Sequence, residues 1–106
     1  MPNDICIFCK IVHHEIPCRL IWSDDNFMAF YDINPKAPIH FLVIPKHHIE
    51  QFSALKDSDR AWLADFMLAI KKAADILNLE HYKIVFNNGS GSGQEVFHLH
   101  AHVLQY

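Results

Sequence analysis

The chain has 106 residues, of which 51% are hydrophobic and 20% are charged, and its net charge is −3 with neutral histidines. This length suits a single domain over residues 1–106 with one compact core. The weak negative charge argues against nucleic acid or an anionic membrane as a partner, and no apolar run is long enough to span a bilayer. Residues 1–4 lack the features of a signal peptide, so we expect a cytoplasmic protein.

The first half of the chain predicts a short helix followed by three strands. The expected elements are a helical turn over residues 8–14, strands over residues 19–22, 27–31 and 40–44, and a turn over residues 23–26. Pro35 and Pro38 keep the approach to the third strand extended, because proline fixes φ and blocks helix. That strand is continuously apolar, so we expect it to be covered on both faces and to end at Pro45.

The second half contains the one clear helical periodicity. Apolar residues recur there at three- and four-residue spacing: Leu63, Phe66, Met67, Ile70, Ala74 and Leu77. Asp57 or Ser58 can cap the start of this helix. Residues 82–86 and 96–104 then read as strands on either side of a glycine-rich loop. Strands, one long helix and further strands predict an α+β fold, with the helix packed on a mostly antiparallel sheet.

Three histidines alternate with apolar residues in the last expected strand, at His98, His100 and His102. Alternate side chains of a strand share a face, so the three imidazoles would form a row at intervals of about 7 Å while the residues between them face the core. Imidazoles without polar partners are costly in a dry core. We therefore expect this row to face a cleft.

The glycine-rich loop over residues 88–94 directly precedes the histidines. Its three glycines permit turns that point successive backbone N–H groups inward, which forms a nest for an anion. A flexible loop is the alternative for such a sequence taken alone. The neighbouring histidines favour phosphate, because neutral histidine is a suitable nucleophile at phosphorus that forms and releases a phosphoramidate.

Cys6 and Cys9 have the two-residue spacing that lets both sulfurs reach one tetrahedral metal ion. In a cytoplasmic chain, metal binding or burial is expected rather than a disulfide. A thioredoxin-like redox role is disfavoured, because no strand precedes the motif. The other alternative is two reduced cysteines that only pack in the fold. A metal ion would need two more ligands, and His47 and His48 follow the central strand.

The sequence GQEVFHLHAHVL over residues 93–104 resembles the signature of the histidine triad (HIT) family, especially its Hint branch. Further stretches match that branch in the same order: residues 7–11, 15–17, 29–33 and 38–46. The resemblance implies an α+β domain with a five-stranded antiparallel sheet, one long helix and a short N-terminal helix. It also implies a homodimer with a continuous ten-stranded sheet.

The resemblance implies catalytic roles for four histidines. His100 is similar to the family nucleophile that becomes covalently nucleotidylated, and His102 to the residue that contacts the α-phosphate and assists proton transfer. His98 is the first member of the triad. His40 resembles a fourth histidine that supports the triad from the neighbouring strand, although a hydrogen-bonded structural histidine is the alternative at this position.

A purine nucleotide site is implied in the same way. Asp32 is similar to the family's ribose-binding carboxylate, and Asn87 to an asparagine at the phosphate and ribose end. The purine slot would consist of Ile33, Phe8, Ile11, Ile16 and Phe30. Phosphate-facing backbone would come from Gly93, Gln94 and Glu95. Without the resemblance, Asp32 could simply start a turn and the slot residues could be ordinary core.

Two departures from the Hint pattern concern specificity. Animal Hint proteins carry a serine where this chain has Glu95, and an ionised carboxylate cannot donate to phosphate as that hydroxyl does. Relatives also continue through a Gly-Gly pair into a tail that reaches the partner's site, whereas this sequence ends at Gln105 and Tyr106. The resemblance therefore does not carry over the substrate preference of the animal proteins, and any specificity supplied by the tail is missing or altered.

The implied activity is that of a purine nucleoside phosphoramidase or related nucleotidyl hydrolase, whose ligand is a purine mononucleotide or nucleoside phosphoramidate. His100 attacks the α-phosphorus, and water then releases the mononucleotide without need of a metal cofactor. Two alternatives belong to other classes. One is a non-catalytic nucleotide-binding or scaffold protein. The other is a zinc metalloenzyme that uses the His-x-His-x-His strand, which is disfavoured because no acidic general base is evident near the triad.

A structural zinc ion is a separate expectation. A subset of bacterial HIT proteins with the same Cys-x-x-Cys opening resembles this chain. Their zinc ligands correspond here to Cys6, Cys9, His48 and His98. In that arrangement His98 anchors the structure, while the other two triad histidines remain free for phosphate.

Overall fold

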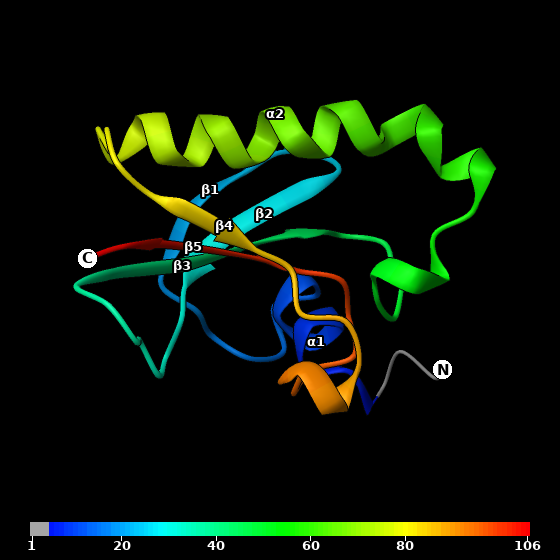
Figure 1. Cartoon of the computed structure of the whole chain (residues 1–106). Coiled ribbons are helices and arrows are strands. Elements are labelled where there is room, and N and C mark those ends of the chain that lie inside the picture. Colours follow the sequence, from blue (N-terminus) through cyan, green and yellow to red (C-terminus); the bar gives the residue numbers. More distant parts are fainter. Residues whose placement is uncertain (1–4) are drawn as a thin grey trace.

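A computed structural model describes residues 5–106, which form a five-stranded antiparallel sheet between two helices (Figure 1). The helices are α1 (Ile7–Val12) and α2 (Arg60–Ile76), and the strands are β1 (Leu20–Ser23), β2 (Phe27–Tyr31), β3 (Ile39–Pro45), β4 (Lys83–Val85) and β5 (Ala101–Gln105). The strand order is β1-β2-β3-β5-β4. The predicted α+β fold class is confirmed. Residues 1–4, on which the expectation of no signal peptide depended, lie outside the described residues.

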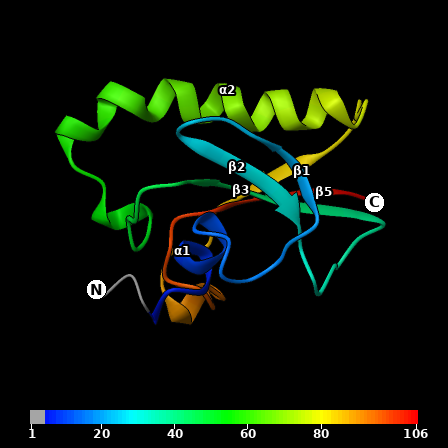
Figure 2. The same cartoon turned by 180° about the vertical axis from the view of Figure 1, so that it is seen from behind.

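The sheet separates two layers, and both views show α2 along one face and α1 against the other (Figures 1 and 2). Side chains of β3 alternate between the layers, with Phe41 and Val43 in the core under α2 and with Leu42 and Ile44 in the core beside α1. The prediction that this strand is covered on both faces is confirmed. Within residues 5–106, no helix combines the length and the hydropathy needed to cross a membrane.

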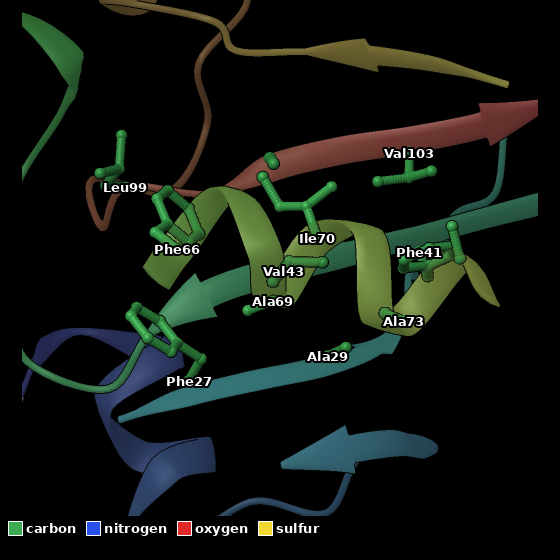
Figure 3. Close-up of a cluster of buried hydrophobic side chains, with 12 residues drawn as sticks. Phe27, Ala29, Phe41, Val43, Phe66, Ala69, Ile70, Ala73, Leu99 and Val103 are labelled. Atoms are coloured by element: carbon green, nitrogen blue, oxygen red, sulfur yellow. The ribbon is translucent and has the colours of Figure 1, made fainter. Parts of the chain in front are cut away.

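The core under α2 consists of side chains from the helix and from the sheet face below it. Figure 3 shows how α2 residues pack across from strand residues: Phe66, Ala69, Ile70 and Ala73 against Phe27, Ala29, Phe41, Val43 and Val103, with Leu99 at one end. Most of the predicted periodic positions face this core. Met67 is an exception, because its side chain is 47% exposed.

The predicted cap of α2 is wrong by one or two residues. A 3-10 turn over Asp57–Asp59 leads into the helix, and neither Asp57 nor Ser58 occupies the cap position. The carboxylate of Asp59 instead accepts a hydrogen bond from the backbone N–H of Lys56 at 2.7 Å. This contact closes the turn that precedes the helix and so fixes where the helix begins.

The last strand is much shorter than predicted. The sequence predicts a strand over residues 96–104, but β5 begins only at Ala101. Residues before it bend away from the sheet, because the backbone N–H of Leu99 donates to the carbonyl of Ile49 at 2.6 Å. The three triad histidines therefore do not form one row along a strand, and His98 lies in a different environment from the other two.

Candidate active site

His100 is a buried histidine that immediately precedes β5 and lines a cavity beside the sheet. Its Nδ1 lies 2.7 Å from the main-chain oxygen of His98. Because a carbonyl can only accept, Nδ1 carries the proton and Nε2 keeps its lone pair. Burial lowers the pKa of His100 below its ordinary value, so the ring is neutral near pH 7. The side chain thus has the protonation state of a nitrogen nucleophile.

His40 and His102 form a hydrogen-bonded pair on neighbouring strands. The backbone N–H of Lys36 donates to Nδ1 of His40 at 3.0 Å, so the proton of the neutral His40 ring lies on Nε2. That nitrogen is 3.0 Å from Nδ1 of His102, to which it donates. The remaining nitrogen of His102, Nε2, therefore carries a proton. Burial lowers the pKa of His40, and burial with the neighbouring His100 and His40 lowers the pKa of His102 to about 4.

Asp32 combines the turn-forming and site-lining roles that the sequence left open. Its Oδ1 accepts from the backbone N–H of Asn34 at 2.9 Å, which is the contact of a turn-starting aspartate. Its Oδ2 lies 3.4 Å from Nε2 of His40, and the residue lines the same cavity as the histidines. The carboxylate thus holds the loop that supplies the Lys36 N–H and also presents negative charge to the cavity.

Asp32, His40 and His102 place three potential ligand atoms within 4.8 Å of one another. Their hydrogen bonds do not suit a metal ion. A metal on Nε2 of His40 would displace the ring proton to Nδ1, where it would face the donating N–H of Lys36. The triad does not form a three-histidine site either, because His98 belongs to another cluster. This geometry argues against the zinc metalloenzyme.

The cavity has a volume of about 680 Å³, which lies within the range of sites for drug-sized ligands. It is bordered by apolar side chains on the α1 side and by histidines on the sheet side. The sequence-predicted residues that line it are Phe8, Ile11, Phe30, Asp32, Ile33, His40, Asn87, Gly93, Glu95, His100 and His102. A ligand with one apolar ring system and one anionic group would match this division.

A second cluster lies beside this cavity and contains the two cysteines of the N-terminal motif. Nδ1 of His98 is 3.4 Å from Sγ of Cys6 and 3.5 Å from Sγ of Cys9, and Sγ of Cys9 is 3.3 Å from Nδ1 of His48. Nε2 of His98 lies 2.7 Å from the carbonyl oxygen of Pro45 and donates to it. Consequently Nδ1 of His98 turns an unprotonated lone pair towards both sulfurs.

The donor set of this cluster fits a zinc ion. Its two sulfurs and two nitrogens lie within 4.8 Å of one another. Zinc bonds of about 2.3 Å to sulfur and about 2.0–2.1 Å to nitrogen place tetrahedral S and N ligands about 3.5 Å apart, close to the distances found. Burial lowers the pKa of His98 to about 4. Burial, with the contact to Cys6, raises the pKa of Cys9 to about 12, so a cation is needed to hold its thiolate.

Sequence comparison assigns a family to this arrangement. The family model described as "Scavenger mRNA decapping enzyme C-term binding" matches residues 5–106. The protein HitA of Neisseria gonorrhoeae is 41% identical over 102 residues, which cover 95% of each chain. The chain belongs to the histidine triad (HIT) family.

Solved structures of HIT proteins agree with this assignment. A HIT family hydrolase from Legionella pneumophila is 45% identical and has a TM-score of 0.89, covering 94% of this chain and 91% of its own. A histidine triad protein from Clostridium difficile is 39% identical, with a TM-score of 0.91 over 98% of this chain and 92% of its own. The family and the fold expected from the sequence resemblance are therefore confirmed.

Three of the residues predicted for catalysis or nucleotide binding do not line the cavity. Ile16 is partly buried and packs against the core beside α1. His98 belongs to the cysteine cluster. The side chain of Gln94 is buried, where its amide oxygen accepts from Gly89 N–H at 2.8 Å and its amide nitrogen donates to the carbonyls of Glu50 and Val96. The Gln94 side chain thus stabilises the glycine-rich loop by its hydrogen bonds.

The glycine-rich loop also differs from the predicted anion nest. The backbone N–H of Gly93 donates to the carbonyl of Ser90 at 3.1 Å, and that of Gln94 donates to the carbonyl of Gly89 at 3.2 Å. Both N–H groups are thus engaged within the loop, which closes on itself in a 3-10 turn. Their contact with a phosphate stays a prediction. Glu95 is the next residue, and it borders the cavity.

Several cavity residues are not among those predicted from the sequence. Lys83 and Val85 of β4 line the cavity together with Tyr106 and Lys36. Lys83, Val85 and the predicted Asn87 are two residues apart in sequence. Since alternate residues of a strand share a face, Asn87 could have identified the other two. Lys36 acts at the site through its backbone N–H, and a side-chain motif gives no signal for such a contact.

Proposed function

We propose that this HIT protein is a purine nucleoside phosphoramidase, which transfers a nucleotide from a phosphoramidate to His100 and then to water. The observation that carries this proposal is the pairing of two ring tautomers in one cavity. His100 has a free lone pair on Nε2, and His102 has a proton on Nε2. A nucleophile and a hydrogen-bond donor are thus available together in neutral rings.

The reaction follows from these two protonation states. Nε2 of His100 attacks the α-phosphorus, and the bond between phosphorus and the leaving nitrogen breaks. The Nε2–H of His102 donates a hydrogen bond to the leaving nitrogen, which departs as the amine with a proton taken from solvent. In the second step water attacks phosphorus, its proton returns to solvent, and the electron pair of the phosphorus–nitrogen bond returns to His100. The products are the mononucleotide and the amine, and both histidines regain their starting states.

The remaining cavity residues supply the nucleotide contacts in this proposal. Phe8, Ile11 and Phe30 form the apolar side on which a purine would pack. The carboxylate of Asp32, whose side chain is 18% exposed, would accept from the ribose hydroxyls. His100 then lies between the apolar side and the His40–His102 pair, where an α-phosphate would be placed.

Steady-state hydrolysis of an adenosine phosphoramidate tests the function against the scaffold alternative. The proposal predicts release of AMP and the amine in equal amounts. A scaffold protein would bind AMP in calorimetry but show no turnover above that of a His100→Gly control. Binding without turnover would therefore favour the scaffold.

We also propose that Cys6, Cys9, His48 and His98 bind one structural zinc ion. The support is the buried Cys₂His₂ donor set and the lone pair that His98 directs at both sulfurs. When bound, zinc would hold both cysteines as thiolates and tie the start of α1 to the segment before β5. The chemistry at phosphorus would use only His100 and His102.

We also propose that two copies of the chain form a homodimer with a continuous ten-stranded sheet. β4 is at the edge of the sheet and pairs with β5 on one side. Ile84 of β4 is 46% exposed, and Met67 and Leu68 of α2 are 47% and 61% exposed. An edge strand and an apolar helix surface of this kind are stabilised by pairing with a second copy.

A further inference from the structure

The position of His100 is not set by the sheet. β5 begins one residue later, and the ladder between β3 and β5 ends with the pair Val43 and Ala101. A residue outside a ladder is held only by its own tertiary contacts. The orientation of the nucleophile therefore depends on what holds residues 96–100.

Two contacts hold the segment directly before His100. The imidazole of His98 is fixed at both ends, with Nδ1 between the sulfurs of Cys6 and Cys9 and Nε2 donating to the carbonyl of Pro45. The backbone N–H of Leu99 donates to the carbonyl of Ile49, which follows the cluster residue His48. The carbonyl of His98 in turn accepts the Nδ1 proton of His100. The cysteine–histidine cluster therefore fixes the backbone group that orients the nucleophile.

A second route runs through α1. Phe8 lies between the two cysteines in sequence, and its ring meets that of His100 edge-on with a centroid distance of 5.1 Å and an interplanar angle of 89°. The same ring packs against Phe30 at 5.6 Å and against His98 at 5.9 Å. The cluster that fixes Cys6 and Cys9 therefore also fixes the aromatic wall beside the nucleophile.

We propose that Cys6 and Cys9, together with His48, are positioning residues for His100. This inference rests on the proposed function for its kinetic consequence, but its structural part is independent of the reaction. When the cluster is intact, the His98 carbonyl and the Phe8 ring hold His100 in one tautomer and one orientation. When a cluster residue is lost, residues 96–100 have no ladder to keep them in place. Misplacement of a reacting group by about 1 Å reduces rates by about 10²-fold.

The test compares Cys9→Ser with Ile70→Val. Ile70 is buried on the opposite face of the sheet, so its variant lowers stability without touching the cluster or the cavity. The first readout is the imidazole nitrogen NMR spectrum of His100, which reports the tautomer without any substrate. The second is the rate of nucleotidyl-enzyme formation in a single turnover with saturating adenosine phosphoramidate.

We expect Cys9→Ser to lose the single Nδ1–H tautomer of His100 and to form the adduct about 10- to 100-fold more slowly. Ile70→Val should retain the wild-type spectrum and rate. If Cys9→Ser does not fold, His48→Gln removes another cluster residue and should show the same change in the spectrum. A folded cluster variant with the wild-type tautomer and rate would overturn the proposal. Absence of any adduct in the wild type would instead count against the proposed function, and the spectrum alone would then decide the positioning role.

Discussion

The Nε2 atom of His40 lies 3.0 Å from Nδ1 of His102, and Lys36 N–H fixes the direction of the hydrogen bond between them. His40→Leu removes the donor, so the proton of His102 can shift to Nδ1 and leave Nε2 unable to donate a hydrogen bond to the leaving group. We expect kcat to fall by about 10²-fold, within the range for loss of one preorganised hydrogen-bond donor, with a smaller change in KM. His40→Gln keeps an N–H donor near the position of Nε2 and should retain more activity. Equal kcat values for the two variants would contradict a role for the hydrogen bond from His40 to His102.

Glu95 borders the cavity in which the leaving group must lie. A carboxylate there should favour a cationic leaving group, such as a lysyl or other amine conjugate, over an anionic one. We expect Glu95→Ser to shift the ratio of kcat/KM values towards anionic leaving groups, and Glu95→Gln to separate the effect of charge from that of size. An unchanged ratio in both variants would mean that the carboxylate does not act on the substrate.

The sequence predicts most of the fold because its patterns are local. Alternation and helical periodicity locate the strands and α2, and the apolar run of β3 predicts a strand that is covered on both faces. The end of the chain is harder to predict, because residues 96–104 satisfy a strand pattern throughout. The bend before β5 is held by the contact of Leu99 with Ile49 and by those of His98 with Cys6 and Cys9, about ninety residues earlier in the chain. No local pattern reports such contacts.

In the site, the residues with motifs can be predicted from the sequence, whereas the contacts made by backbone groups cannot. The triad, Asp32 and the apolar slot residues are recognisable from their motifs. The direction of the His40–His102 hydrogen bond depends on the backbone N–H of Lys36. The closed loop at Gln94 depends on hydrogen bonds between its side-chain amide and the backbone of Gly89 and Glu50. Backbone donors and acceptors are the same for nearly every residue type, so their use at a site follows only from the structure.

The exposed edge of β4 predicts a dimer whose assembly is sensitive to charge. Light scattering at micromolar concentration should give twice the monomer mass for the wild type. Ile84→Lys places a charge on the edge strand and should shift the equilibrium towards monomer. Glu80→Lys, which places a lysine outside the strand, serves as the control. A monomeric wild type under these conditions would refute the dimer.

The cysteine–histidine cluster predicts a zinc-dependent stability. Elemental analysis of protein purified without an affinity tag should find about one zinc per chain. Cys6→Ala should lose the metal and lower the melting temperature, whereas Cys18→Ala, at a cysteine outside the cluster, should keep the zinc content of the wild type. Metal-free wild-type protein whose melting temperature does not change on chelation would leave the cysteines as packing residues.

The central claim is that Nε2 of His100, freed by the Nδ1 contact with the carbonyl of His98, attacks phosphorus. Intact-protein mass spectrometry after incubation with a slowly hydrolysed adenosine phosphoramidate tests it most directly. We expect a mass increase of one AMP per chain in the wild type, located at His100 by peptide mapping, and no increase in His100→Gly. An adduct that persists in His100→Gly, or one that maps to another residue, would contradict it.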